Sequence, residues 1–382
     1  MTNQLEDALN YSLQIIAQNM ATVPYFPERW EGGAWITSEK DRIPSHWVDG
    51  FWTGLLWLAY AHTEDAAFEQ AARKWTADLA WLKTTTLTHD LGFIFYLSNV
   101  LGYRITGDEA LLPDAIVAVE TFTQRYNPRG EFMQAWGRVD GPRNERGRIN
   151  VDLMMNMPFF YWGSAQTGDM KYGRIASRHG RTSRHTLMRP DGSISQVADF
   201  NPDTGVFLRQ ETFQGLSFDT CWSRGLAWAL YGFAESYRWT GDAVFLHTAR
   251  NIAKYAIANA PADKVPFWDY NSLDIPNTYR DTSAASVIAA GLLELAAGET
   301  DKALAVEWRA EAETILVSLW ENYSTRETAV SAILLHASRS VPHNLMDHPL
   351  IYGDYYFVEA VLRLLRPDLI ESIFTRTQLT VG

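Results

Sequence analysis

Cysteine and long apolar runs are the two features that this 382-residue sequence almost lacks. The single cysteine, Cys221, cannot form an intramolecular disulfide, which favours a reducing compartment. No uninterrupted apolar stretch reaches the length of a membrane-spanning helix. The first residues contain Glu6 and Asp7 and no basic region followed by an apolar run, so they do not resemble a signal peptide. We therefore expect a cytoplasmic protein.

Positive charge is also scarce, since 33 Lys and Arg face 45 Asp and Glu, which gives a formal net charge of −12. Nucleic acids and anionic membrane surfaces both require a clustered positive field, so we expect neither as a partner. An anionic small molecule remains possible if a local arginine or a set of neutral donors offsets the repulsion. The sequence does not separate a monomer from a small homo-oligomer, and we expect one of the two.

Cofactor motifs are missing as well. The sequence contains no zinc-ligand spacing, phosphate loop, dinucleotide fingerprint or nucleophile elbow. His46, His89 and His348 have no partners at ligand spacing. We interpret them as structural or substrate-contacting residues, with a structural role favoured for His46 and His348. We expect no metal and no organic cofactor.

What the sequence does contain is a recurring turn between helix-like stretches. Glycine ends one helix and aspartate caps the next in such turns. Apolar residues recur at helical spacing after each turn, whereas strand-like alternation is scarce. The turns are Thr-Glu-Asp at 63–65, Thr-Gly-Asp at 106–108, 167–169 and 240–242, and Gly-Glu-Thr-Asp at 298–301.

These turns predict roughly twelve helices, or six helical hairpins, once the helical patterns near 5–20 and 355–365 are added. Six hairpins that close on themselves form an all-α (α/α)6 toroid with a funnel at one end. Because none of the irregular stretches has the composition of a free linker, we expect a single domain over 1–382. Long connections usually carry function. They lie at 23–46, 127–148, 189–218, 261–279 and 338–353.

Fifteen tryptophans stand out in the composition. Flat indole faces stack on sugar rings while the indole N–H donates a hydrogen bond, which suggests a carbohydrate ligand. Core packing is the commoner use of any single tryptophan, because aromatic side chains dominate core energetics. The clustered tryptophans are Trp30, Trp35, Trp47, Trp52 and Trp57, followed by Trp222 and Trp228.

Two aspartates are candidates for acid and base chemistry. Asp152 lies in a largely apolar run at 150–158, where poor solvation raises the pKa of a carboxyl group and lets it hold a proton near neutrality. Asp90 follows His89, and a pair of carboxyl groups is the usual arrangement of a glycosidase. The alternatives are a helix cap or an arginine partner for Asp152, and a helix cap for Asp90.

Arg224 and Trp228 are four residues apart and so share one helix face. Such a face offers a cation for a carboxylate and a stacking platform for a sugar ring. The alternative is a helix that packs its tryptophan while the arginine pairs with an acid such as Asp219.

Taken together, these segments resemble the unsaturated glucuronyl hydrolases of glycoside hydrolase family 88. One such motif would be weak, but eight in order along the chain are specific. The matching segments are WVDGFWTG (47–54), HDLGF (89–93), QAWG (134–137), NVDLMMNMP (150–158), QG (214–215), WSRGLAW (222–228), YRDTSA (279–284) and GDYY (353–356).

The resemblance implies a six-hairpin toroid and an unusual reaction on an unsaturated uronic-acid oligosaccharide. The enzyme hydrates the C4=C5 bond that a polysaccharide lyase leaves on the terminal sugar, and the hydrated sugar then opens and releases the rest of the chain. Asp152 matches the general acid and base, and Asp90 matches a group that stabilises or positions the reacting sugar. The residues that match the sugar pocket are Trp47, His89, Trp136, Gln214, Arg224 and Trp228.

One departure concerns Gln196, which occupies a position where the family typically has a histidine near the substrate. We therefore include Gln196 among the substrate-binding residues. The segment 338–352 also has no clear counterpart to the serine and lysine pattern that some relatives use for sulfate.

Three other functions compete with this one. An unsaturated rhamnogalacturonyl hydrolase would share the toroid and the hydration chemistry but act on pectin fragments. An inverting glycosidase would use the two aspartates at the anomeric carbon of saturated sugars. A non-catalytic sugar-binding protein would retain its function after Asp152→Asn.

Overall fold

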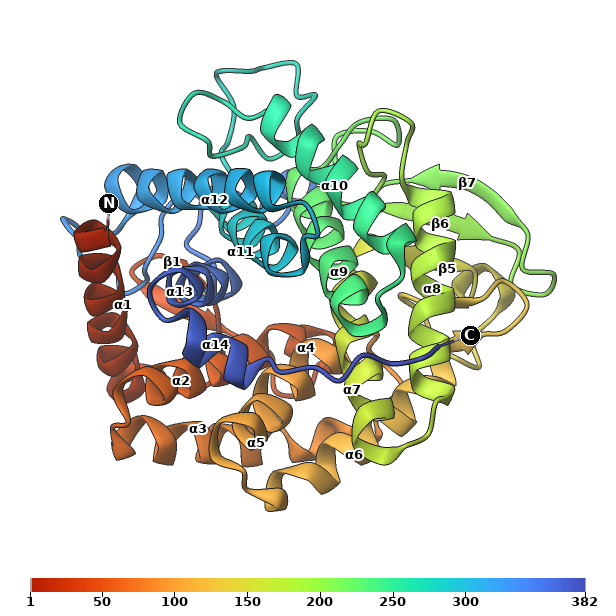
Figure 1. The fold of residues 1–382 in the computed structure, drawn as a ribbon, viewed down its shortest axis with the longest axis horizontal. Coiled ribbons are helices and arrows are strands. Elements are labelled where there is room, and N and C mark those ends of the chain that lie inside the picture. The colour runs from red at the N-terminus through yellow and green to blue at the C-terminus, as the bar shows by residue number, and fades with distance from the viewer. Residues whose placement is uncertain (1, 382) are drawn as a thin grey trace.

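The computed structural model describes residues 2–381. Six helical segments form a ring in which each segment contacts the next and the last contacts the first (Figure 1). The inner ring consists of α2 (Asp49–Thr63), the continuous run α4 (Leu91–Phe95), η3 (Tyr96–Val100) and α5 (Leu101–Thr106), α7 (Met157–Thr167), α9 (Ser223–Thr240), α11 (Thr282–Gly298) and α13 (Ile351–Leu365).

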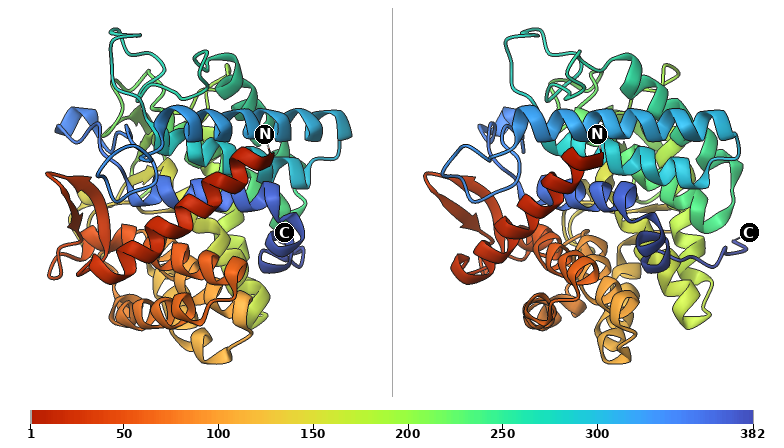
Figure 2. Two further views of the ribbon diagram at one scale, coloured as in Figure 1. Left: turned by 90° about the vertical axis from the view of Figure 1, so that its left-hand side faces the viewer. Right: turned by 60° about the vertical axis from the view of Figure 1, so that its left-hand side comes forward.

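A second set of helices covers the outside of this ring. Helix α1, at the start of the chain, packs against α12 and α13 and so becomes the outer partner of the last inner helix (Figure 2). The predicted (α/α)6 toroid is confirmed, with a short helix α14 (Pro367–Ile373) after the last inner helix. The outer helices are α3 (Ala66–Asp78), α6 (Leu112–Phe122), α8 (Lys171–Leu187), α10 (Ala243–Ala258), α12 (Lys302–Tyr323) and α1 (Thr2–Thr22).

The Thr-Gly-Asp turns join inner helices to outer ones as the sequence predicts. Gly241 ends α9 with φ of 67°, a left-handed conformation that glycine adopts without strain. Asp242 then caps α10, because its side chain accepts a hydrogen bond of 2.9 Å from the backbone N–H of Val244. Thr240 Oγ1 accepts the N–H of Asp242 at 3.1 Å and completes the turn.

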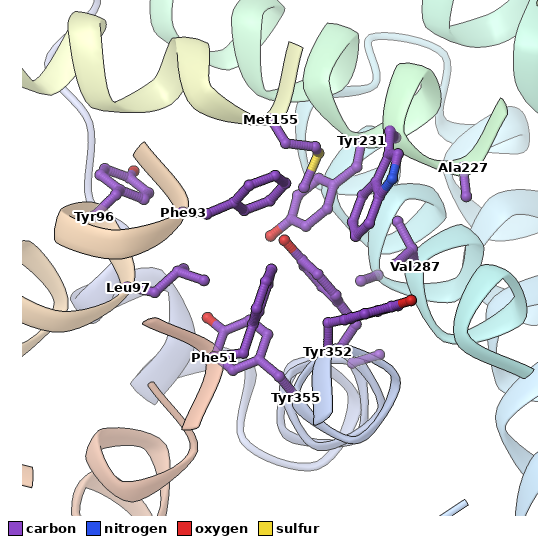
Figure 3. Packing of buried hydrophobic residues seen from close by; sticks show 14 of the residues in the cluster. Phe51, Phe93, Tyr96, Leu97, Met155, Ala227, Tyr231, Val287, Tyr352 and Tyr355 are labelled. Carbon is purple, nitrogen blue, oxygen red and sulfur yellow. The ribbon is translucent and has the colours of Figure 1, made fainter. Parts of the chain in front are cut away.

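The centre of the ring is filled with aromatic side chains rather than left open. Phe51 of α2, Phe93 of α4 and Tyr352 and Tyr355 of α13 point toward one another (Figure 3). Phe51 lies 5.1 Å from Phe93 and 5.9 Å from Tyr352 between ring centroids. These inner helices are buried on nearly all sides, so their sequences are apolar all round rather than amphipathic. The aromatic core closes the toroid below the funnel.

Three small antiparallel sheets lie in the connections that the sequence predicts as irregular. Strands of two to five residues are too short to show an alternation, which is why the sequence does not reveal them. Short 3₁₀ segments also precede several helices, among them η1 (Ile43–Val48), η7 (Val151–Asn156) and η8 (Val341–His343). The strands are β1 (Pro27–Glu31), β2 (Ala34–Thr37), β3 (Tyr126–Asn127), β4 (Phe132–Met133), β5 (Arg148–Asn150), β6 (Val197–Phe200) and β7 (Phe207–Glu211).

The remaining 3₁₀ segments join or extend the helices. They are η2 (Ala80–Thr84), η4 (Glu109–Leu111), η5 (Thr123–Arg125) and η6 (Arg143–Glu145).

None of the helices within residues 2–381 is long and apolar enough to cross a membrane.

Candidate active site

A pocket of about 450 Å3 opens at the end of the toroid where the inner helices begin. Trp47 precedes α2, Asp90 precedes α4, Asp152 precedes α7 and Arg224 lies in the first turn of α9. Helix N-termini carry partial positive charge, so this end of the ring favours an anionic ligand despite the net charge of the chain. Seven of the nine predicted residues line the pocket, namely Trp47, His89, Asp90, Trp136, Asp152, Gln214 and Arg224.

Asp152 is partly exposed to the pocket, but its Oδ1 atom is buried and has no hydrogen-bond partner among residues 2–381. The side chain neither caps a helix nor pairs with an arginine there, so the two structural alternatives are not realised. Burial, followed by the nearby charge of Asp90, raises the pKa of Asp152 to about 7, and Arg224 opposes this effect only in part. Asp152 therefore holds a proton near neutrality.

Asp90 occupies the N-cap position of α4 but makes no capping hydrogen bond with its side chain. Instead, its carboxyl oxygens accept long hydrogen bonds of 3.4 Å from Thr88 Oγ1 and Asn156 Nδ2. Burial raises the pKa of Asp90 to about 7, while Asn156, Arg125 and Thr88 act to lower it. Asp90 therefore has hydrogen-bond donors and a nearby cation that favour its ionised form. Asp152 Oδ1 has no such donor within residues 2–381.

Asn156 is a site residue that the sequence analysis did not single out. Its Oδ1 accepts the backbone N–H of Phe93 at 3.0 Å while its Nδ2 faces Asp90. The side chain thus ties the start of α4 to η7, the segment that carries Asp152. Its place four residues after Asp152 was the available signal, because that spacing brings the two residues one helical turn apart.

His89 is buried beside Asp90. Its Nε2 is 3.1 Å from Asn150 Nδ2 and 3.6 Å from Asp90 Oδ2, and its ring meets Trp136 edge to face at 5.6 Å. Burial and, second, the charge of Arg125 lower the pKa of His89 to about 3. His89 is therefore neutral over the whole working range of pH and serves as a hydrogen-bonding group.

Arg125 is the second functional residue that the sequence did not reveal. Its guanidinium is buried and donates to backbone carbonyls, including those of Gln134 at 2.9 Å, Trp136 at 3.1 Å and Gly137 at 2.9 Å. Burial lowers the pKa of Arg125 to about 10, which leaves it charged at neutral pH. The side chain holds the segment that carries Trp136 and places a cation near Asp90.

Arg224 lines the pocket but is engaged by the protein. Its Nη1 donates to Asp281 Oδ2 at 2.7 Å, and its terminal nitrogens also donate to the carbonyls of Ser338 and Arg339. The suggested partner Asp219 is wrong, because Asp281, the N-cap of α11, lies next to the start of α9 in the ring. Arg224 thus joins two inner helices to the connection before α13 and presents its charge to the pocket from a fixed position.

Gln196 does not line the pocket, contrary to the prediction, but supports a residue that does. Its Nε2 donates to Gln214 Oε1 at 2.8 Å, and its Oε1 accepts the backbone N–H groups of Phe213 and Gln214, each at 2.7 Å. Gln214 in turn donates to the carbonyl of Arg339 at 2.8 Å. Gln196 immediately precedes β6, and its side chain contacts the loop that follows β7.

Trp228 is also absent from the pocket wall, although the sequence predicts a stacking platform there. The side chain is 1% exposed and packs against Phe93 and Tyr356, both at 5.5 Å. Trp228 lies one helical turn beyond Arg224, inside the aromatic core of the ring, where it supports the floor of the pocket. The sequence predicts that the two residues share a helix face, but not that Trp228 is buried in the core below the pocket.

Other aromatic residues form the rim of the pocket. Phe213, which is 54% exposed, packs against His343 at 4.4 Å and Trp136 at 5.7 Å. These three residues come from three separate connections. His46, by contrast, is buried below the rim and forms a 2.6 Å contact with Asp49, which fits its predicted structural role.

A pocket of sugar size with aromatic walls and two carboxyl groups in different surroundings, built on an (α/α)6 toroid, defines a glycoside hydrolase. The sequence profile of Glycosyl Hydrolase Family 88 matches residues 22–356. The chain belongs to this family, which confirms the resemblance.

Several characterised relatives match nearly the whole chain. The unsaturated glucuronyl hydrolase of Bacillus sp. (strain GL1) is 35% identical and aligns with 94% of this chain and 97% of its own length. An unsaturated chondroitin disaccharide hydrolase of Streptococcus agalactiae is 32% identical over 95% of this chain and 92% of the relative. The crystal structure of the Bacillus sp. GL1 enzyme superposes with a TM-score of 0.90 at 32% identity, covering 96% and 97% of the two chains.

Proposed function

We propose that this enzyme removes the terminal 4,5-unsaturated glucuronic acid from lyase-generated oligosaccharides by hydrating the C4=C5 double bond. Support comes from family membership and from relatives named as unsaturated glucuronyl and chondroitin disaccharide hydrolases. The observation that carries the proposal is the contrast between Asp152, whose Oδ1 lacks a hydrogen-bond partner within residues 2–381, and Asp90, which has donors.

The first step is a proton transfer from Asp152. The raised pKa of about 7 keeps the carboxyl group protonated below neutrality, which a general acid requires. The proton goes to C4, and the double-bond electrons form the new C–H bond. Asp152 is left as a carboxylate, which then accepts a proton from the water that adds at C5. One residue thus serves as acid and then as base.

Asp90 has a complementary role in this proposal. Protonation of C4 leaves positive character shared between C5 and the ring oxygen, and an ionised carboxylate nearby stabilises it. The hydrogen-bond donors of Thr88 and Asn156 and the charge of Arg125 favour that ionised form. Because one negative charge raises the pKa of its neighbour, an ionised Asp90 also helps Asp152 to keep its proton.

The remaining pocket residues position the sugar. Trp47 and Trp136 offer ring faces and edges at the walls, and neutral His89 and Gln214 offer hydrogen bonds. Arg224 and the inner-helix N-termini favour the substrate carboxylate. We also propose, from the single buried cysteine, that the enzyme works in the cytoplasm on small products of secreted or imported polysaccharide.

The test compares a set of unsaturated disaccharides with a saturated one. Purified enzyme is mixed with unsaturated disaccharides from chondroitin, hyaluronan, heparin, gellan and pectin, and with a saturated glucuronyl disaccharide. We expect the ultraviolet absorbance of the conjugated double bond to fall with at least one glucuronyl substrate, and the saturated sugar to remain intact. Cleavage of the saturated sugar would instead indicate a conventional inverting glycosidase. A preference for the pectin fragment would indicate the rhamnogalacturonyl activity.

A further inference from the structure

One segment of this acidic chain is rich in cations. Residues 125–189 contain twelve Lys or Arg against five Asp or Glu, although the whole chain has a net charge of −12. Helix α8, which contains five of these cations and no acid, lies beside strands β5, β6 and β7 (Figure 1). A cluster of cations in this segment locally favours an anionic ligand, although the chain as a whole is acidic.

The sheet β5–β6–β7 concentrates this charge at one end. Arg148, Asp199 and Arg209 are directly opposite one another in register across the three strands. Asp199 holds both arginines, Arg148 Nε at 2.8 Å and Arg209 Nη2 at 3.0 Å. Their side chains are 49% and 63% exposed. A single carboxylate therefore faces two exposed guanidinium groups.

A second shared carboxylate lies in the same region. Asp203 contacts Arg143 Nε at 3.1 Å and Arg146 Nη2 at 3.6 Å. Glu211 also accepts a hydrogen bond from Arg209, so four arginines face three carboxylates. The contacts of Arg143 and Arg148 use Nε, and no hydrogen bond within residues 2–381 engages their Nη groups. Such a fork of donors matches a carboxylate.

Arg143, Arg148, Asp199 and Arg209 line a groove of about 470 Å3, close in volume to the active-site pocket. Arg143, Arg148 and Arg209 supply its donors, and Asn144 and Asn201 add neutral polar groups. Leu208, which is 58% exposed, supplies apolar surface beside the buried Phe200 and Pro202. Charged donors beside an apolar face are what an acidic sugar ring requires.

The groove and the pocket lie at opposite ends of the same sheet. The groove is lined by the first residue of β5 and the last residue of β6, whereas the pocket is lined by Asn150 at the end of β5 and by Phe213 after β7. Arg148 and Asn150 point to the same face, because side chains alternate along a strand. At about 3.3 Å per residue, the two sites are on the order of 10 Å apart along the sheet.

We propose that this groove is a second binding site, which holds the carboxylate of an internal uronic acid while the terminal unsaturated sugar occupies the pocket. The proposal rests on the proposed function, since it assigns the same substrate two contact points. A disaccharide fills the pocket only. A tetrasaccharide whose third sugar is a uronic acid reaches the groove as well and gains affinity there.

The test compares the unsaturated disaccharide and tetrasaccharide that a lyase releases from hyaluronan, which carries no sulfate. The variant Arg143→Gln/Arg209→Gln removes two groove donors whose side chains are 62% and 63% exposed, so the fold is retained. We expect KM for the tetrasaccharide to rise about tenfold, with kcat and the disaccharide KM unchanged. The matched control Arg174→Gln/Arg184→Gln removes two charges from α8, outside the groove.

The two double variants distinguish a specific binding site in the groove from general electrostatic attraction of the substrate. Equal KM changes for both substrates, or equal effects of the groove and α8 variants, would overturn the proposal, because either result indicates long-range attraction alone. Calorimetric titration of the tetrasaccharide into Asp152→Asn, with and without the groove substitutions, gives a readout independent of turnover. If wild type turns over neither substrate, the proposed function fails, while a loss of tetrasaccharide affinity in the groove variant still supports the second site.

Discussion

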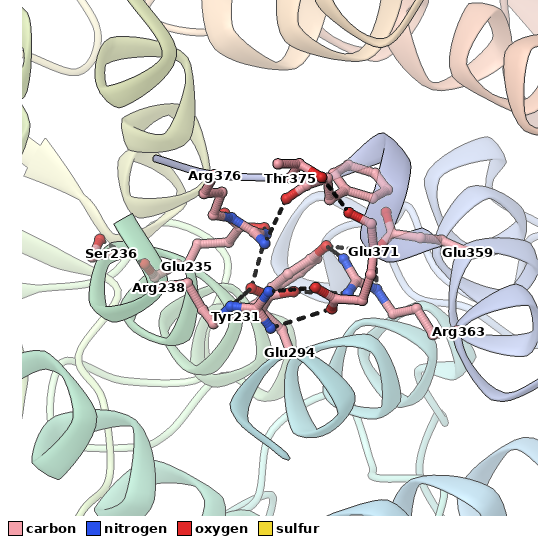
Figure 4. Close-up of polar contacts among 12 residues, drawn as sticks. Tyr231, Glu235, Ser236, Arg238, Glu294, Glu359, Arg363, Glu371, Thr375 and Arg376 are labelled. Atoms are coloured by element: carbon pink, nitrogen blue, oxygen red, sulfur yellow. Dashed lines mark hydrogen bonds and ion pairs between the residues drawn. The ribbon is translucent and has the colours of Figure 1, made fainter. Parts of the chain in front are cut away.

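Two buried groups of carboxylates at opposite ends of the toroid differ in how completely they are paired. At the base, Glu294 accepts from Arg363 at 2.7 Å and lies 2.8 Å from Arg376, and Glu359 accepts from Arg363 at 2.9 Å (Figure 4). Burial alone would raise the pKa of Glu294, but Arg376, Arg363 and Arg238 together lower it to about 2. At the pocket, Asp152 has a pKa of about 7.

Burial raises the pKa of both carboxyl groups, but only Glu294 has several cationic partners that reverse this effect. Glu294 is ionised, and the ion pairs around it join α9, α11, α13 and the C-terminal tail into one unit (Figure 4). Removing one partner of a buried ion pair destabilises the fold, because the other charge is left buried without compensation. The pocket leaves Asp152 without a strong partner, and that deficit is what makes its proton available for chemistry.

Asp152→Asn tests the pocket side of this comparison and has the largest expected effect. Asparagine keeps the shape of aspartate but cannot supply or accept the proton. We expect kcat to fall at least about a thousandfold, with affinity for the unsaturated disaccharide retained, as measured by absorbance decay and by calorimetry. Turnover within tenfold of wild type would show that another group transfers the proton, and unchanged function would indicate a binding protein.

Arg363→Met tests the base of the toroid. The substitution leaves Glu294 and Glu359 without a major partner in a buried site, so we expect the free energy of unfolding to fall by about 3–5 kcal/mol. The kcat of the folded fraction should stay near that of wild type. The measurement is denaturant unfolding combined with active-site titration. The control Arg73→Met removes two ion pairs, with Glu69 and Asp108, from a side chain that is 37% exposed, and should cost about 1 kcal/mol or less.

The two ends should also differ in how stability depends on pH. The pKa of Asp152 is raised from 3.8 to about 7, so the folded state binds this proton more tightly than the unfolded state and loses stability as pH rises through that window. Asp152→Asn removes the free-energy cost of ionising this buried carboxyl group. We expect the free energy of unfolding of the variant to exceed that of wild type by about 1–3 kcal/mol at pH 8, with no difference near pH 4, in calorimetric melting. A variant that is less stable than wild type at pH 8 would contradict this.

Gln196→Ala gives the smallest expected effect and tests the support of the pocket wall. The change leaves the N–H groups of Phe213 and Gln214 without their acceptor, which loosens the loop that carries Gln214. We expect KM for the disaccharide to rise about tenfold and kcat to change less than about threefold. Gln196→Glu keeps an acceptor oxygen and should restore much of the KM. A large loss of kcat in both variants would place Gln196 in the chemistry instead.

The sequence predicts the toroid well because its turns are local. A glycine with positive φ and an aspartate cap depend on neighbouring residues alone, as at Gly241 and Asp242. The strands of the connections are different. Arg148 pairs with Asp199, and Asp199 with Arg209, only after distant segments meet, so no local pattern predicts the sheet.

The sequence predicts the site residues that lie in ordered motifs. It misses features that depend on how deeply a side chain is buried or on contacts between distant segments. Helical spacing places Arg224 and Trp228 on one face but does not tell which residue reaches the pocket and which packs in the core. Arg125 is one arginine among many in the sequence, and only the folded chain shows it buried among carbonyl oxygens. The catalytic roles of Asp152 and Asp90 remain predictions that the variants test.

The most direct test of the central claim, that Asp152 starts the reaction as a protonated acid, is the pH dependence of kcat for loss of the double-bond absorbance. The pKa values of Asp152 and Asp90 are both raised to about 7, and the charge of Asp90 opposes ionisation of Asp152, so the pair shares one proton around neutrality. We therefore predict a bell-shaped profile with its maximum at mildly acidic to neutral pH. Loss of the Asp152 proton lowers the rate above the maximum, and protonation of Asp90 lowers it below. A rate that climbs steadily into the alkaline range would contradict the account, because the reaction would then require Asp152 to be ionised from the start.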